Sequence, residues 1–469
     1  MPQDDPTEID PRQWRPFLRL GEYLSKEFLI LAEEWLFLVR EYGTSKSESR
    51  AATKEQFLEF TAHVHDGWKD AQRRIADFLI DALARRSAAE ANQKEQHRLK
   101  SKEGKRLARE DAARIGLEIS VARRMLDVIL WTIFAGDHST LRRLHVDGGE
   151  HNLSAANIVD AMKAADHFNK DAQVMALSTD MLSFVHVGDL ILASRAEGSI
   201  SFIELKAGEK NVDIAQTAEF AVQSECEYFE ALATSGYNET DRKHYERVKR
   251  QAKRNDTIVS TIRNEGGTDP NTGSKVVIQP TPDPVEHWSE DVMRCYESLN
   301  ESKKWAISVI EECVYVGVYS DQRMAFVGFQ AWMKQQGCES RIFSLTDSFR
   351  DPGVRPLGAT FLSLDLQKKI LRGEILVIMC LDILKMIDLA NKLQPGYLQL
   401  ATKAETVRMR GQRVGDFTLN GLFIRANVAG EVTFLGGGFR DRVLFDQQRP
   451  AQLLSQHLAM APLATREQP

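Results

Sequence analysis

The sequence predicts an α/β (α+β) protein, and its apolar patterning carries that prediction. Residues 1–145 keep apolar side chains at helical spacings, whereas residues 146–350 mix helical patterns with short apolar runs typical of strands. Residues 351–469 combine one long helical pattern with further short runs. We therefore expect a helical accessory domain, a central domain built on a mixed sheet, and an α+β accessory domain, in that order.

In the first region, apolar residues recur every three or four positions, which favours buried helices. Residues 88–111 differ, because they carry mixed charge and few large apolar side chains. We interpret them as a solvent-exposed helix rather than a coiled-coil arm or a flexible tether, since Pro is absent and Ala is frequent. The helical stripes comprise Leu29, Leu31, Trp35, Leu36 and Val39, then Phe57, Phe60, Val64 and Trp68.

The central region begins with an amphipathic helix over 154–168, for which Ser154 is the expected cap. A strand over 174–187 and a two-stranded hairpin around a turn at 196–199 follow. A helix over 213–232 buries an apolar stripe that includes Cys226. Later strands of the same core are expected at 305–310, 314–319 and 341–345.

The third region is predicted to start with a long buried helix over 366–393. Short strands should follow at 416–426, 431–435 and 442–446. The run Gly436-Gly437-Gly438 lacks a following Lys-Ser/Thr, so we interpret it as a β-turn and not as a phosphate-binding P-loop.

Three chemically active residues fall on the central hairpin. Asp189 heads one strand, and Glu204 and Lys206 close the other. A turn at 196–199 would place Asp189 directly across from Lys206, and alternation would put all three side chains on one face. Opposed and diagonal neighbours on a hairpin lie roughly 5 and 7 Å apart, close enough for two carboxylates to share a cation. Leu190, Leu192, Ile203 and Leu205 would point into a core on the other face.

The segments Val187-Gly188-Asp189-Leu190-Ile191-Leu192 and Phe202-Ile203-Glu204-Leu205-Lys206-Ala207-Gly208 resemble the PD-(D/E)xK nuclease superfamily. The first motif has Gly188 where Pro is usual. The resemblance implies a restriction-endonuclease-like core over 146–350 and a site that holds Mg²⁺, with Mn²⁺ as a substitute. It further implies Asp189, Glu204 and the Leu205 carbonyl as metal ligands, with Lys206 as a catalytic residue that positions water or stabilises the phosphorane.

The same resemblance suggests supporting residues. A further acidic ligand is expected before the first strand, where Glu150 and Asp160 are both candidates. Gln216 and Gln223 lie two turns apart on the helix after the hairpin, where one branch of the superfamily carries Gln-x-x-x-Tyr. Phe220 and Glu227 stand at the Tyr positions here, which favours simply solvated glutamines.

One strongly basic helix is predicted over 241–254. Lys243, Arg247, Arg250 and Arg254 recur at helical spacing on one face, while Tyr245, Val248 and Ala252 occupy another that could anchor the helix. The functional interpretation is a sequence-independent contact to phosphate groups, and the alternative is a solvated cationic face.

Composition limits the partners and the cellular compartment that we expect for the protein. The 469 residues carry a net charge of −6, so contacts to nucleic acid must be local. Five Cys residues show no Cys-x-x-Cys pairing, and the acidic N-terminus has no apolar signal segment. We expect a cytoplasmic protein with no membrane contact.

The sequence thus predicts a Mg²⁺-dependent nuclease whose partner is nucleic acid, DNA before RNA, with restriction or anti-phage (antiviral) defence as the role the resemblance suggests. Two alternatives stay open: an RNase with the same site, and an inactive nuclease-fold scaffold or sensor. With no Walker motif in the chain, a separate ATPase or sensor subunit would supply any motor function, and a homo-oligomer is compatible with this interpretation.

Overall fold

The computed structural model combines helices with several small antiparallel sheets, which confirms the mixed α+β class. One apolar core extends from Leu20 to Leu454 and joins the helical N-terminal part to the sheets. The structure describes residues 20–47, 53–144, 153–185, 187–195, 197–205, 209–224, 226–264, 266–268, 275–277, 284–349, 351–410, 417–428 and 430–464.

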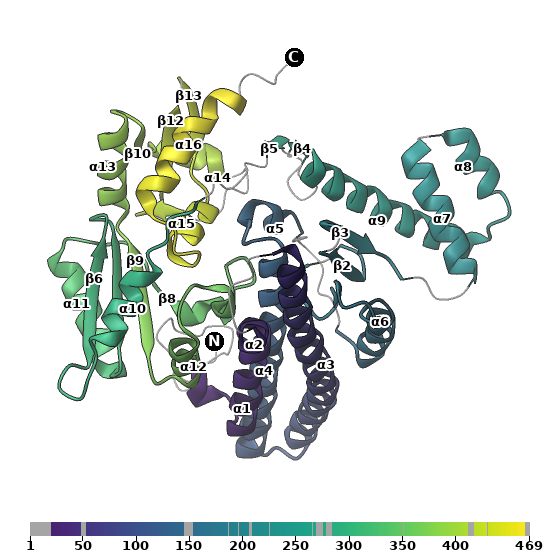
Figure 1. Cartoon of the computed structure of the whole chain (residues 1–469), viewed down its shortest axis with the longest axis horizontal. Coiled ribbons are helices and arrows are strands. Elements are labelled where there is room, and N and C mark those ends of the chain that lie inside the picture. Colours follow the sequence, from purple (N-terminus) through teal and green to yellow (C-terminus); the bar gives the residue numbers. More distant parts are fainter. Residues whose placement is uncertain are drawn as a thin grey trace.

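Two long helices dominate the N-terminal part and form a helical hairpin (Figure 1). The single helix expected over 88–111 is wrong, because the chain reverses at Lys100, which adopts a left-handed φ of 58°, and Ser101 caps the second helix. The tip is nevertheless exposed, as predicted. The elements are η2 (Leu20–Tyr23), α1 (Lys26–Arg40), α2 (Tyr42–Lys46), α3 (Lys54–Arg98), α4 (Lys102–Ile133) and α5 (His138–Leu144).

A small three-stranded sheet lies against this helical hairpin and α6. Ser154 caps α6, as predicted. The strand expected over 174–187 is shorter, because residues 179–184 turn and bend while Met181 and Leu182 remain fully buried. Burial without extended pairing explains why these residues looked like a strand. The elements are α6 (Ala155–Phe168), β1 (Val174–Ser178), β2 (Leu190–Ser194) and β3 (Ser199–Ile203), in the order β1-β2-β3.

After the small sheet, three helices project to one side of the molecule (Figure 1). The helix expected over 213–232 is interrupted before Cys226, which is exposed and extended rather than buried in a stripe. Ile214 and Ala218 are buried as predicted, against Tyr245 and Val248. The elements are α7 (Glu209–Ser224), α8 (Glu227–Ala233), α9 (Glu239–Arg263), β4 (Gly266–Thr268) and β5 (Lys275–Val277).

A separate four-stranded sheet follows, in the order β6-β7-β9-β8. The strands expected to complete the central core therefore belong to a different sheet from the 189–206 hairpin, and this sheet crosses the boundary expected at residue 350. The long helix expected over 366–393 is wrong: Gly373 ends a helix with a left-handed φ of 74°, and a fully buried strand follows. A strand buried on both faces shows no alternation, so its sequence resembles a buried helix. The elements are α10 (Ser289–Glu297), β6 (Trp305–Ile310), β7 (Val314–Tyr319), α11 (Gln322–Gln335), β8 (Ile342–Ser344), η3 (Leu345–Phe349), η4 (Leu357–Ala359), α12 (Leu364–Arg372) and β9 (Leu376–Leu381).

The C-terminal part packs helices around a further four-stranded antiparallel sheet, in the order β10-β12-β11 with β13 paired to β12. The strand expected at 442–446 is wrong, because α15 covers most of it. The Gly436-Gly437-Gly438 run is not a β-turn: Gly436 is the N-cap of that helix. The elements are α13 (Ile383–Leu393), β10 (Leu398–Leu400), α14 (Lys403–Arg410), β11 (Thr418–Leu419), β12 (Leu422–Val428), β13 (Glu431–Phe434), α15 (Gly437–Leu444) and α16 (Pro450–Ala464).

Candidate metal and nucleic-acid site

The two candidate metal ligands lie at the open end of the β2–β3 hairpin. The last pair in the ladder is Leu190 with Ile203, so Asp189 and Glu204 are the residues that directly adjoin this pair at the end of the hairpin. The expected register, with Asp189 across from Lys206, differs by two residues from the observed ladder, in which Ser194 pairs with Ser199. A shift of two keeps the parity, so continued alternation would still put the two carboxylates on one face.

The two faces of the β2–β3 hairpin pack against different partners, α6 on one face and the main core on the other. Leu190 belongs to a cluster with Ala161 and Ala165 of α6, and Leu192, Ile203 and Leu205 pack against that cluster, as predicted. Ile191 and Phe202 are paired on the opposite face and contact the main core. By alternation, Asp189 and Glu204 continue this second face.

Asp189 is held in place by backbone hydrogen bonds. Its N–H donates to the Ile203 carbonyl at 2.7 Å, and its Oδ2 accepts the Leu205 N–H at 2.5 Å. Gly188 precedes it with a left-handed φ of 68°, and a Cβ built there would lie 3.0 Å from the Ile203 oxygen. Both constraints favour glycine at this position.

Glu204 is held by a residue that sequence reasoning missed. Gln251 of α9 donates from Nε2 to Glu204 Oε1 at 2.8 Å. The glutamines predicted as supporting residues, Gln216 and Gln223, lie instead on the helix directly after the hairpin. Nothing local in the sequence indicates Gln251, because 47 residues separate it from Glu204.

The other candidate residues lie on the helices that flank the hairpin in sequence or outside the described residues. Asp160 is 78% exposed and forms a surface ion pair with Lys163 on α6, and such exposure does not suit a ligand of an enclosed metal site. Gln216 and Gln223 are both exposed on α7. Lys206 and Glu150 lie outside the described residues.

The basic helix is present as α9 and runs beside the hairpin, to which Gln251 connects it. Tyr245 and Val248 are buried against α7, as predicted for the anchoring face. A hydrogen bond from Lys249 to Glu230 secures α9 to α8 and lowers the pKa of that carboxyl group.

The four residues predicted to contact phosphate differ in their exposure and in their partners. Arg247 and Arg250 are exposed, whereas exposed Lys243 already pairs with Glu239 at 2.7 Å. Arg254 is partly buried, and its Nε has no hydrogen-bond partner among the described residues. Because Arg254 follows Gln251 by three residues, it lies on the side of α9 that faces Glu204.

The donor set of this site fits a hard cation. Two carboxylates side by side offer the oxygen ligands that Mg²⁺ and Mn²⁺ prefer, and Mg²⁺ commonly uses one or two carboxylates with several waters. No group of three or more His, Cys, Asp or Glu side chains poised for a metal was found within the described part of the chain. A cation here would therefore depend on the Asp189–Glu204 pair, backbone oxygen and water.

Comparisons with protein-family models, curated proteins and solved structures found no match. Among the described residues, no helix has both the length and the apolar character needed to cross a membrane.

Proposed function

We propose that this chain is a metal-dependent nuclease that cleaves phosphodiester bonds, DNA before RNA, at the open end of the β2–β3 hairpin. The observation that supports it most is that Asp189 and Glu204 directly follow the last pair of the β2–β3 ladder, with Gln251 bonded to the glutamate. Two carboxylates at one end of a hairpin supply the oxygen ligands that a divalent metal such as Mg²⁺ prefers.

Each group of candidate residues would have its own role in the reaction. Asp189 and Glu204 would hold Mg²⁺ or Mn²⁺, which supplies charge neutralisation at the scissile phosphate and a more acidic bound water. Lys206, two residues after Glu204, would stabilise the developing negative charge. Arg247 and Arg250 would bind the nucleic-acid backbone and bring a phosphate to the hairpin.

The deciding experiment incubates the purified protein with supercoiled plasmid, linear DNA and RNA, each with Mg²⁺, Mn²⁺, Ca²⁺ or EDTA. We expect cleavage with Mg²⁺ and Mn²⁺, little with Ca²⁺, whose larger and looser coordination shell positions water poorly, and none with EDTA. Cleavage that survives thorough chelation would point to a metal-free mechanism and overturn the proposal.

A matched pair of variants locates the site. Glu204→Gln should lower cleavage by more than about a hundredfold, because metal and charge stabilisation contribute several kcal/mol. Glu197→Gln makes the same substitution on the loop of the same hairpin, where the carboxylate is exposed and accepts a hydrogen bond from the Ser199 hydroxyl. Equal activity of the two folded variants would remove Glu204 from the reaction.

A further inference from the structure

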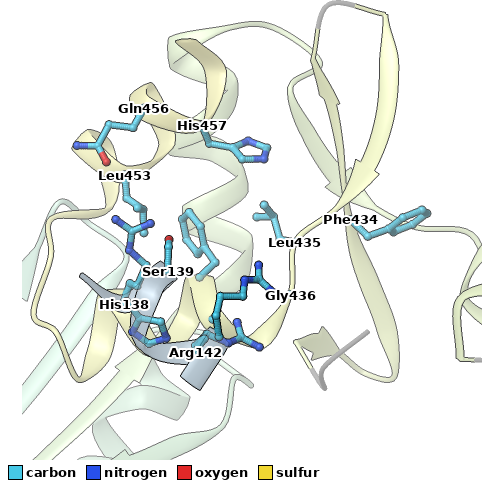
Figure 2. Close-up of a pocket in the computed structure, with 13 residues that line it drawn as sticks. His138, Ser139, Arg142, Phe434, Leu435, Gly436, Leu453, Gln456 and His457 are labelled. Atoms are coloured by element: carbon cyan, nitrogen blue, oxygen red, sulfur yellow. The ribbon is translucent and has the colours of Figure 1, made fainter. Parts of the chain in front are cut away.

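A cavity of about 260 Å³ lies far from the hairpin in sequence and is formed where α5 meets the C-terminal part (Figure 2). Its walls come from α5, the end of β13, the first turns of α15, and α16. The lining residues are His138, Ser139, Arg142, Arg143, Phe434, Leu435, Gly436, Gly438, Phe439, Arg442, Leu453, Gln456 and His457.

The cavity is strongly cationic. Arg142 and Arg143 from α5 and Arg442 from α15 contribute three guanidinium groups, and no Asp or Glu is present among the described lining residues. Burial lowers the pKa of Arg442, although a guanidinium keeps its charge at neutral pH. The nearest acidic residue of α15, Asp441, is engaged with Arg440 at 2.7 Å. Asp446 and Asp137 act on Arg442 from outside the lining, and an anion placed among the three guanidinium groups would be attracted by each of them.

The N-terminus of α15 opens into the same cavity. Gly436 is its N-cap and provides no side-chain cap, and the first turn has no acidic residue. The first N–H groups of a helix lack internal partners and, with the helix dipole, attract anions. Arg142 lies directly over this turn: a Cβ built on Gly438 would come within 2.2 Å of its Nη1. Glycine therefore lets the guanidinium and the helix N-terminus approach the same point.

A buried histidine supplies an independent sign of a ligand. His138 is only 4% exposed, and its Nδ1 lies 3.2 Å from Asp446 Oδ2. Burial alone would raise the pKa of Asp446, but His138 and Arg355 outweigh it and hold that pKa low, so Asp446 is ionised and Nδ1–H donates to it. The other ring nitrogen, Nε2, is buried without a hydrogen-bond partner among the described residues. A buried polar atom left unpaired costs about 1–3 kcal/mol, which a bound ligand would recover.

We propose that this cavity binds the phosphate of a small phosphomonoester, of the size of a mononucleotide or smaller. Arg142, Arg442 and the α15 amides would hold the phosphate oxygens, since guanidinium groups and helix N-termini both suit that geometry. When its ring is protonated, His138 would donate from Nε2–H to a phosphate oxygen. Leu435 and Leu453 line the remainder with apolar surface, suited to a less polar body attached to the phosphate. The volume is below that of typical drug-sized pockets, which limits the ligand to this size.

Isothermal titration calorimetry of the full chain tests the proposal with inorganic phosphate, a nucleoside monophosphate, the matching nucleoside, and a dinucleotide with and without a 5′-phosphate. We expect inorganic phosphate and the probes with a phosphomonoester group to bind. The nucleoside, and the dinucleotide whose only phosphate is the internal phosphodiester, should give no heat. A mononucleotide that binds more tightly than phosphate identifies a free nucleotide-like ligand. Preference for the 5′-phosphorylated dinucleotide identifies the end of a nucleic-acid strand as the source of the same phosphate.

Two variants and one control assign the binding to this cavity. Arg142→Gln alters an exposed side chain and should weaken the binding of phosphorylated probes by about tenfold or more, because a charge-assisted hydrogen bond is lost. Ser139→Asp places a negative charge in the lining and should weaken binding similarly. Lys102→Gln removes an exposed cation at the tip of the helical hairpin and should leave binding unchanged. No heat with any phosphorylated probe, or equal affinity of wild type and both folded cavity variants, would overturn the proposal. Nuclease activity depends on a different site, so either result can occur without the other.

Discussion

At the scale of single residues, hydrogen bonds hold the two carboxylates at the end of the β2–β3 hairpin. The Leu205 N–H holds Asp189, and the Gln251 amide holds Glu204. Residues that orient a metal ligand commonly matter for affinity nearly as much as the ligand itself. In the proposed site Gln251 would be a positioning residue, whose contribution can be separated from that of the ligands.

Replacing Gln251 with Ala should raise the Mg²⁺ concentration needed for half-maximal cleavage by about 10- to 100-fold, because Glu204 loses the bond that orients it. Saturating Mg²⁺ should restore part of the activity, which a direct role in the chemistry would not allow. Gln216→Ala, on an exposed glutamine of α7, is the matched control and should match wild type. An unchanged Mg²⁺ requirement in the Gln251 variant would contradict the assigned role.

His65 gives a prediction about pH. It is buried on α3, its Nδ1 lies 3.2 Å from the Ala172 carbonyl just before β1, and burial lowers its pKa to about 4. In the unfolded chain its pKa is about 6.5, so between these values the unfolded state binds the extra proton. Stability contributed by the neutral ring is therefore present above about pH 6.5 and is lost as pH falls toward 4, by up to about 3 kcal/mol.

Urea unfolding at pH 7 and pH 4.5 measures this effect. His65→Gln should flatten the pH dependence, because the substituted side chain does not titrate, whereas His97→Asn at an exposed position of α3 should leave it unchanged. The same slope in wild type and His65→Gln would show that other groups cause the acid sensitivity.

At the scale of elements, α9 has a buried side and an opposite side that carries the functional candidates. Tyr245 and Val248 are buried against α7. Gln251 reaches the hairpin from the other side, where Arg247, one turn earlier, and Arg250 are exposed. Asn238 forms a capping box with Asp241 at the start of the helix and so fixes where it begins. The helix thereby connects a cationic surface rigidly to the carboxylate pair.

Changing both Arg247 and Arg250 to Glu should weaken binding to every nucleic-acid sequence tested. The slope of log affinity against log salt concentration should fall by roughly two units, about one for each lost phosphate contact. Fluorescence anisotropy across a salt series measures both quantities. Lys102→Glu with Lys105→Glu makes an equal change in charge on exposed residues of α4 and should have little effect. Identical slopes for the two double variants would show that the α9 arginines do not contact the backbone.

At the scale of the whole molecule, a buried ion pair joins distant parts of the chain. Arg124 and Asp127 on α4 are both almost completely buried and lie 2.7 Å apart. Arg124 also donates to the carbonyls of Ser348 and Val354, and Asp127 accepts the Ser183 N–H. The pair thus holds α4 to the segment before the β2–β3 hairpin and to the segment between β8 and β9.

Asp127→Ala should destabilise the protein by about 3–5 kcal/mol, because it leaves the Arg124 charge buried without its counter-ion. Asp81→Ala breaks the exposed ion pair with Arg85 on α3 and should cost less than about 1 kcal/mol. Equilibrium urea unfolding compares the two variants. If both variants lose less than about 1 kcal/mol of unfolding free energy, water reaches Arg124 and solvates it.

The sequence by itself determined what local physics controls. It indicated the mixed class, the hairpin, the shared face of Asp189 and Glu204, the cap at Ser154 and the buried side of α9, since alternation, helical spacing and capping are properties of neighbouring residues. Only the tertiary structure decided the rest. β9 looked helical because a doubly buried strand has no alternating pattern, and strands expected in one sheet pair in another because pairing depends on distant partners. The contact of Gln251 with Glu204 and the gathering of Arg142 and Arg442 around one cavity likewise bring together residues that are far apart in the chain, and no local pattern records such proximity.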